Sequence, residues 1–403
     1  MRSHGQLALL GAFLLAPTAE GAARSSTGST SSLLAGQRPA SVPKNDSPDE
    51  TFEDVARRAT EAHQARRFEE AERLYRQGLD LRPGWTEGCF GLGVALYELD
   101  RFPEARVAFR RVLADAPESA AAWTMAGLCS YRLEEYETAL AEVHKGRELP
   151  VGEPQDLKAV ANYHFGILLI RFGRYEMAFE ALREFAVRER DSPEVVEAFG
   201  LSVLRLPVLP SDAPVEKREM ILMAGRAGYQ LARGLRSGAT RRTFELLVER
   251  YPEEPNVRYA WGVFLLQDEP EAALGEFRRT LRLDPAHVPA MCRIAVQMVK
   301  QGLYEEALPT ADLAARTNPQ NFVARNVLGR VLLELGETDR AVEELEEAAR
   351  LAPDSAQAFL HLARAYQHAG RKEDAEEARV TFLRLDMAAR GRTASGAGES
   401  PVE

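Results

Sequence analysis

The sequence predicts an all-α protein, built as an α-solenoid superhelix of about nine to ten helix-turn-helix repeats. Prolines mark a period of 34 residues, at Pro83 and Pro117 and again at Pro285, Pro319 and Pro353. Four repeats carry glycine where the chain must reverse between two helices: Gly173, Gly302, Gly336 and Gly370. A small residue is followed twelve positions later by alanine in seven places, beginning at Ala59, Gly93, Gly127, Gly166, Ala295, Gly329 and Ala363. A fixed period of this size is typical of stacked repeats.

Residues 91–117 show why each repeat is expected to be a pair of helices. Two apolar stripes recur at helical spacing, made by Leu92, Ala95, Leu96 and Leu99 and then by Ala105, Ala108, Phe109 and Val112. The chain reverses between them, and Pro103 falls where the second helix begins, a position that needs no amide donor. Gly93 and Ala105 are expected where the two backbones come closest, because a large side chain there would force the pair apart.

These residues resemble the tetratricopeptide repeat, a 34-residue helix pair with small residues at fixed positions. The resemblance is carried by Leu92, Gly93, Ala105, Phe109 and Pro117, by Trp123, Gly127, Ala139 and Gly146, and by Phe359, Leu362, Ala363, Tyr366 and Ala375. Units beginning near residues 52, 86, 120, 159, 193, 220, 255, 288, 322 and 356 cover almost the whole chain from 52 to 389. The resemblance implies a protein that binds other proteins.

The repeats divide into three expected regions. Regular N-terminal repeats span 51–192, degenerate repeats span 193–253, and C-terminal repeats with a capping helix span 254–389. In the middle region, the segment 206–214 carries three prolines and must leave the helix. A long helix from about Val215 to Arg233 is expected to start the next unit. The Pro-rich insertion is either tolerated in a decayed repeat or acts as a hinge or contact loop.

Both ends of the chain are expected to lie outside the repeats. Residues 1–23 have the pattern of a signal peptide, with an apolar stretch from Leu7 to Ala16 and cleavage after Ala23. Ten apolar residues rise only about 15 Å as a helix, so no integral membrane span is expected in the mature chain. We therefore expect export to a periplasmic or secreted location; the alternatives are a membrane tether through an uncleaved leader, or a misassigned start. Residues 24–50 and 390–403 are expected to be a disordered Ser/Thr/Pro-rich linker and a disordered tail.

Composition and motifs argue against most kinds of chemistry. The formal charge of −10, with arginines interspersed among glutamates, disfavours nucleic acid as a partner. No motif for catalysis, a cofactor or a metal is present, so we expect a non-enzymatic protein without cofactor. Cys89 and Cys129 are expected in the core. His361 and His368 lie seven residues apart on one helix and are expected at the surface.

The resemblance places the groove-facing sites at the second, fifth, ninth, twelfth and thirteenth residues of each unit. In the second to fourth units these sites give an apolar strip, edged by two arginines: Phe90, Val94, Tyr97, Leu128, Tyr131, Tyr163, Ile167, Ile170, Arg132 and Arg171. In the last two units they give a polar set: Asn326, Arg330, Glu334, Arg364, Gln367 and His368. The strip, with Asn326 and Arg330, is the predicted partner-binding site; the alternative is that curvature buries several of its residues as core.

The expected function is therefore a scaffold that binds a protein or peptide ligand in the concave groove of the solenoid. One alternative is a regulatory or substrate-recruiting subunit of an enzyme that acts in trans. A second alternative is self-assembly through exposed terminal helices. The helix from about Glu373 to Ala389 is charged on much of its surface, as a capping helix should be, which disfavours self-assembly. The sequence leaves the oligomeric state open.

Overall fold

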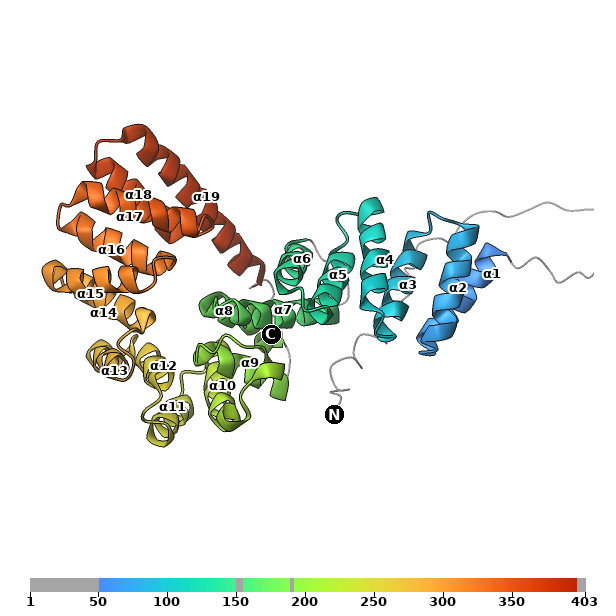
Figure 1. Ribbon diagram of the computed structural model, residues 1–403, viewed down its shortest axis with the longest axis horizontal. Helices are drawn as coiled ribbons and strands as arrows, with labels where there is room; N and C mark the ends of the chain where they lie inside the picture. The colour runs from blue at the N-terminus through green and yellow to red at the C-terminus, as the bar shows by residue number, and fades with distance from the viewer. Residues whose placement is uncertain (1–50, 150–154, 189–191, 397–403) are drawn as a thin grey trace, which may run out of the picture. The chain divides into compact units, whose positions relative to one another are not determined.

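The computed structural model describes residues 51–149, 155–188 and 192–396, and all its regular structure in these ranges is helical (Figure 1). This confirms the all-α prediction. The chain divides into two compact units, Met1–Ala181 and Leu182–Glu403. The boundary lies inside one helix, earlier than the expected boundaries at 192 and 253. The described residues contain nineteen α-helices, most of which pair as hairpins.

The first unit is a stack of helix hairpins that alternate first and second helices. Their bounds are α1 Phe52–Gln64, α2 Phe68–Leu81, α3 Thr86–Glu98, α4 Phe102–Asp115, α5 Ala120–Arg132, α6 Tyr136–Glu148, α7 Gln155–Arg171 and α8 Tyr175–Arg188, the last crossing the boundary. From α1 to α7 each helix packs on the next, and the first helices α1, α3, α5 and α7 also contact one another in sequence. That second set of contacts decides which groove-facing residues stay accessible.

The second unit begins irregularly and then returns to regular hairpins. Its bounds are α9 Pro193–Val203, the 3-10 turns η1 Pro210–Asp212 and η2 Val215–Lys217, α10 Arg218–Ala232, α11 Gly238–Arg250, α12 Pro255–Leu265, α13 Pro270–Leu283, α14 Val288–Lys300, α15 Tyr304–Thr317, α16 Phe322–Glu334, α17 Thr338–Leu351, α18 Ala356–His368 and α19 Lys372–Gly396. From α12 onward the helices pair as α12 with α13, and so on to α18 with α19.

Most reversals inside the hairpins place one residue in the left-handed backbone conformation. Four glycines supply it inside hairpins, including Gly336 at φ 80° and Gly370 at φ 74°, and Gly234 supplies it between α10 and α11. Three hairpins of the first unit use other residues at the same position: Arg66, Asp100 and Glu134, with φ between 56° and 61°. Because a Cβ disfavours this conformation, these three turns carry local strain.

The expected close approach of the paired helices is confirmed at Gly93. A Cβ built on this residue would lie 2.7 Å from the ring of Phe109, which is fully buried on α4. The ring of Phe109 packs edge-on against Phe90, with centroids 5.4 Å apart. Glycine at this position therefore makes room for a large aromatic ring on the second helix.

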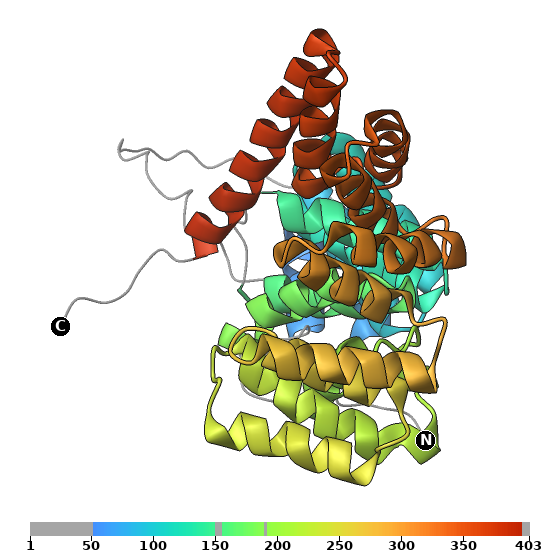
Figure 2. The same cartoon turned by 90° about the vertical axis from the view of Figure 1, so that its left-hand side faces the viewer.

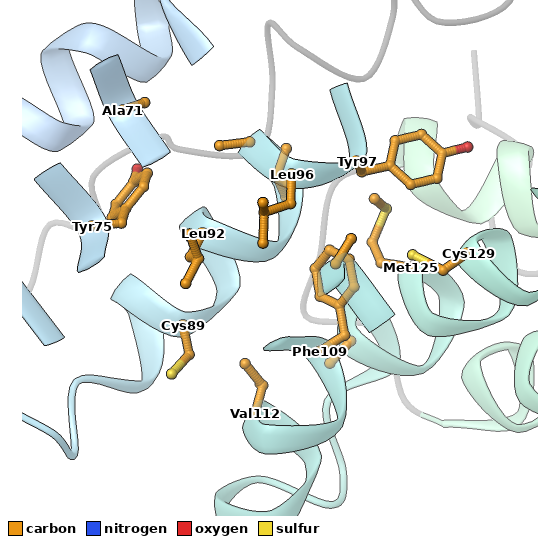
Figure 3. Close-up of a cluster of buried hydrophobic side chains, with 14 of the residues drawn as sticks. Ala71, Tyr75, Cys89, Leu92, Leu96, Tyr97, Phe109, Val112, Met125 and Cys129 are labelled. Carbon is orange, nitrogen blue, oxygen red and sulfur yellow. The ribbon is translucent and has the colours of Figure 1, made fainter. Parts of the chain in front are cut away.

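Each unit has its own apolar core along the line where the helices meet. In the first unit the core joins α1 to α5, and Figure 3 shows Leu92, Leu96, Phe109, Met125 and Cys129 pointing toward one another within it. Cys89 and Cys129 are both buried, as expected for small core residues. Burial raises the pKa of the Cys129 thiol to about 12, so it stays protonated at neutral pH.

The region 193–253 differs from the expected pattern of units. Glycines on α9 and α10 bring these two helices into close contact: a Cβ on Gly200 would lie 2.0 Å from the carbonyl oxygen of Ile221, and a Cβ on Gly225 would lie 1.9 Å from that of Val196. The long helix expected from 215 to 233 therefore closes a hairpin with α9 instead of starting a new unit. The helix α11 is left unpaired between α10 and α12.

The ends of the chain lie partly outside the described residues. The expected signal peptide at 1–23 and linker at 24–50 fall there, as does the part of the expected tail from 397 to 403. The helix α19 runs to Gly396, past residue 389 where the repeats were expected to end. None of the helices in the described ranges combines the length and apolar character that a membrane crossing requires.

Candidate functional site

Most of the predicted apolar strip lies inside the stack. Six of its members are less than one-tenth exposed: Val94, Tyr97, Leu128, Tyr163, Ile167 and Ile170. The ring of Tyr97 packs edge-on against Phe102, and burial raises the pKa of its hydroxyl to about 12. These side chains fill the space where the first helices contact one another. They match the alternative that the sequence analysis left open, in which curvature turns groove positions into core.

Four members of the strip remain accessible at its edge. Phe90 and Tyr131 are half-buried, and Arg132 and Arg171 are exposed. The guanidinium of Arg132 lies 4.2 Å above the ring of Phe102 and donates to Asp100 Oδ1 at 3.2 Å. A cation held on an aromatic face is more ordered than a free surface arginine. This edge of the first unit therefore presents ordered polar and aromatic groups.

Aromatic rings continue this edge from α5 to α7. The ring of Tyr131 lies 5.2 Å from His164 and 5.9 Å from Tyr136, and Arg171 lies 5.9 Å from the Tyr136 ring. Burial lowers the pKa of His164 to about 4, so the imidazole is neutral at pH 7. Its Nδ1 is 2.9 Å from the carbonyl oxygen of Val160, to which a protonated nitrogen donates. We call Tyr131, Arg132, Tyr136, His164 and Arg171 the edge cluster.

A second candidate surface lies on α16 and α18 in the second unit. Asn326 is buried, and its Oδ1 accepts from Nδ1 of His361 at 2.5 Å. Burial lowers the pKa of His361 to about 4, and the nearby guanidinium groups of Arg330 and Arg364 lower it further. The structure thus corrects the expected surface position of His361: it is a neutral, buried bridge between two first helices. His368 is exposed, as expected.

Arg330 has hydrogen-bonding capacity that the described chain leaves unused. It lies one turn after Asn326 on the same helix and is half-buried. Its Nε is buried and has no acceptor among the described residues. On the next first helix, Arg364 donates to Glu334 Oε1 at 3.4 Å. A guanidinium with an unsatisfied buried N–H favours an incoming carbonyl or carboxylate oxygen.

Two exposed apolar residues share the groove-facing sites of these two repeats with Arg330 and were not among the predicted site residues. Val323 is 42% exposed on α16, and Leu360 is 38% exposed on α18. Both occupy groove-facing sites, the second of the ninth unit and the fifth of the tenth. The groove-facing positions of the repeat therefore include both residues, but the sequence prediction for these two repeats named only polar side chains. We call Val323, Asn326, Arg330, Leu360 and Arg364 the C-terminal patch.

Neither the edge cluster nor the C-terminal patch includes a metal-binding group of side chains. The described residues contain no group of three or more His, Cys, Asp or Glu side chains that could hold a metal ion. Burial raises the pKa of the Cys292 thiol to about 12, as it does for Cys129. The side chains of both surfaces can form hydrogen bonds, ion pairs and apolar contacts with a partner.

Sequence profiles of the tetratricopeptide-repeat family match this chain at residues 62–129 and at residues 326–379. The first match covers hairpins of the first unit, and the second covers the hairpins that carry the C-terminal patch. The chain is a tetratricopeptide-repeat protein. The resemblance read from the sequence is thereby confirmed, and the fold supports a role in protein interaction.

Similarity to individual proteins is more limited. The chain is 32% identical over 144 residues to cellulose synthase operon protein C of Xanthomonas axonopodis pv. citri, a match that spans 34% of this chain and 10% of that protein. MamA from Desulfovibrio magneticus RS-1 is 20% identical with a TM-score of 0.37, covering 42% of this chain and 96% of MamA. The Cut9–Hcn1 structure is 16% identical with a TM-score of 0.35, covering 83% and 79%.

Proposed function

We propose that this tetratricopeptide-repeat protein is a non-enzymatic scaffold that binds a peptide or protein partner on the first-helix face of its repeats. The observation that carries the proposal is Arg330, whose buried Nε lacks an acceptor among the described residues, on a groove-facing surface that also presents the exposed apolar side chains of Val323 and Leu360. This arrangement suits a peptide that presents an apolar side chain next to an acidic or carbonyl group. The hairpins are already ordered, so binding costs mainly the ordering of the peptide.

The edge cluster of the first unit is the second contact surface in this proposal. Tyr131, Arg132 and Arg171 are its accessible members of the predicted strip, and aromatic and arginine side chains dominate many protein interfaces. The buried members of the strip, such as Ile167, would act indirectly by fixing the first helices. The predicted binding role of the strip thus narrows to its accessible residues.

Site-specific photocrosslinking in cells tests the proposal. A photoreactive residue is placed at position 360 of the full-length protein, and a second variant carries it at position 131. The matched control is position 313, because Leu313 is similarly exposed but lies on the second helix α15. We expect a discrete protein partner from 360, from 131 or from both, and none from 313. Equal capture at all three positions, or no capture at 360 and 131, would contradict the first-helix face as the binding surface.

We also propose that the protein is exported, on the basis of the apolar stretch Leu7–Ala16 and the small residues that end at Ala23. Cell fractionation with mass spectrometry of the intact chain tests this. A chain that begins at Arg24 in an exported fraction supports cleavage. A chain that keeps Met1 and sediments with membranes would instead indicate a tether, and a cytoplasmic chain with Met1 would refute export.

A further inference from the structure

The second helices of the regular hairpins in the second unit are covered by the first helix that follows. The helix α14 packs on α13, α16 packs on α15, and α18 packs on α17. On α17, Ala349 is buried, and Glu346, although its side chain is 42% exposed, has an Oε1 that accepts from Tyr366 and from Arg371 of the next hairpin, each at 2.9 Å. These two positions of a second helix therefore face the next repeat.

The corresponding positions of α19 are apolar and uncovered. Adding the 34-residue period to Glu346 and Ala349 gives Val380 and Leu383, which are 55% and 47% exposed. Met387, one turn further, is 66% exposed. The three residues share one face at spacings of three and four. The sequence predicts a charged capping helix here, but the structure shows an apolar stripe on the face where another helix would pack.

The first helix of the repeats, α1, has a polar exposed face, in contrast to α19. The exposed face of α1 carries Asp54, Arg57 and Glu61, which pair with one another: Arg57 lies 2.9 Å from Glu61 and 3.4 Å from Asp54. A terminal repeat with a polar outer face stays soluble without a partner. The stripe on α19 lacks this protection, and the charged face of α1 does not match it as a partner surface.

The length of α19 leaves the stripe reachable. It has 25 residues and is therefore about 37 Å long, whereas α18 has 13 residues and is about 20 Å long. Figure 2 shows α19 continuing well past the end of α18. A second helix can therefore lie along the outer face of α19 without displacing the hairpin.

The charges along α19 favour a particular partner and direction. Its first eight residues hold four acidic and two basic side chains, and residues 384–396 hold three arginines and one aspartate. Two copies of α19 in antiparallel orientation bring the acidic start of each helix beside the basic end of the other. A parallel pair would align like charges, and antiparallel helix dipoles also attract.

We propose that α19 pairs in antiparallel orientation with α19 of a second copy of this chain, forming a symmetric dimer through the stripe Val380, Leu383 and Met387. Leu383 lies beside the two-fold axis, and Val380 of one copy lies opposite Met387 of its partner. The same surface meets itself, as a two-fold interface requires. The dimer is additional to the scaffold role and doubles the number of partner sites. Because each copy contributes only three apolar side chains to the stripe, we expect a weak dimer, with a dissociation constant in the micromolar range.

Sedimentation velocity of the full chain over a concentration series tests the dimer. We expect dimers that dissociate on dilution, and we expect Leu383→Glu to raise the dissociation constant more than tenfold, because two carboxylates would meet at the axis. Leu313→Glu, at a similarly exposed leucine on α15, should dimerise like the native chain. Met387→Glu provides an independent second variant, and circular dichroism confirms that each variant is helical.

Engineered cysteines test the orientation. The three native cysteines are buried, so a single Leu383→Cys should form an intermolecular disulfide, because an axis brings identical residues together. Val380→Cys alone should not, whereas Val380→Cys combined with Met387→Cys should. Disulfides from Val380→Cys alone would indicate a parallel pair and overturn the antiparallel arrangement. A monomer at all concentrations, an open-ended series of oligomers, or a dimer unaffected by both glutamate variants would overturn the proposal.

Discussion

His287 is predicted to make the second unit sensitive to acid. Its Nδ1 accepts from the backbone N–H of Ala290 at 3.1 Å, which caps the first turn of α14. Its Nε2 lies 2.9 Å from Asn256 Oδ1, to which the Nε2–H donates. The ring also packs on Tyr259, with centroids 5.0 Å apart. The cap requires the neutral ring, because protonation of Nδ1 would set two donors against each other, whereas the Nε2–H can donate to Asn256 in either protonation state.

The sign and the size of the effect follow from the pKa. Burial, with a smaller contribution from Arg205, lowers the pKa of His287 to about 4, although Asp284 raises it slightly. A group whose pKa is lowered by folding contributes stability that is complete above its unfolded pKa of about 6.5 and is lost as the pH falls toward the folded pKa. At about 1.4 kcal/mol for each pH unit, roughly 2 kcal/mol is lost between pH 6.5 and pH 5.

The repeat itself supplies the matched variant. Asn321 stands 34 residues after His287 and caps α16 in the same way, accepting from the backbone N–H of Ala324 at 3.1 Å. His287→Asn therefore keeps a capping acceptor and removes the titrating group. At pH 7 we expect its free energy of unfolding to lie within about 1 kcal/mol of the native value. At pH 5 we expect the variant to have lost about 2 kcal/mol less than the native chain.

Urea unfolding at both pH values, followed by circular dichroism, measures this difference. Hydrogen exchange of the first amides of α14 reports the same event locally. Three other buried histidines, His63, His164 and His361, also have a pKa near 4 and remain in both proteins, so their contributions cancel in the comparison. A difference between native chain and variant that stays constant from pH 7 to pH 5 would refute the assigned role of His287.

Three further predictions concern the first unit. Phe109→Ala should cost about 3–5 kcal/mol in urea unfolding, because the ring is fully buried against Gly93 and Phe90; a loss under 1 kcal/mol would contradict that packing. Glu134→Gly should raise stability by about 0.5–1 kcal/mol, because residue 134 has φ 61°; a clear loss would show that the turn is not strained. Cys129 should resist alkylation in the native chain and react in urea; rapid native labelling would exclude its burial.

The repeat pattern predicted the hairpins well because it records contacts within a hairpin. Gly93 and Phe109 are sixteen residues apart, and the same kind of packing recurs between Gly262 and Phe277, which are fifteen residues apart. Turn glycines such as Gly336 mark the reversals directly. Glu134 could not be recognised as a turn residue, because a glutamate in left-handed conformation leaves no compositional mark.

The pairing of α9 with α10 could not be predicted from the period. Gly200 and Gly225 lie 25 residues apart, whereas Gly93 and Ala105, the expected close-approach pair of a regular repeat, lie twelve residues apart. Their contact is visible only when the two helices are placed together, since each glycine fits against a backbone carbonyl oxygen of the other helix. The Pro-rich segment lengthens the connection and allows α10 to take this position.

The groove-facing positions of the repeat do not by themselves predict that the strip is buried, because burial also depends on the side chain at each position. In three successive repeats of the first compact unit, the ninth groove-facing position is occupied by Val94, Leu128 and Ile167. All three side chains are buried. The same site is Arg330 and Arg364 in the last two repeats, and both keep contact with solvent. First helices lined by apolar residues gain from packing on one another, whereas a guanidinium resists complete removal from water. A groove-facing site therefore remains available to a partner when its own side chain is polar or lies at the edge, as at Arg330 and Tyr131. An apolar residue at the ninth site predicts tighter stacking of the repeats, and the binding surface has to be sought among the neighbours that this stacking leaves exposed.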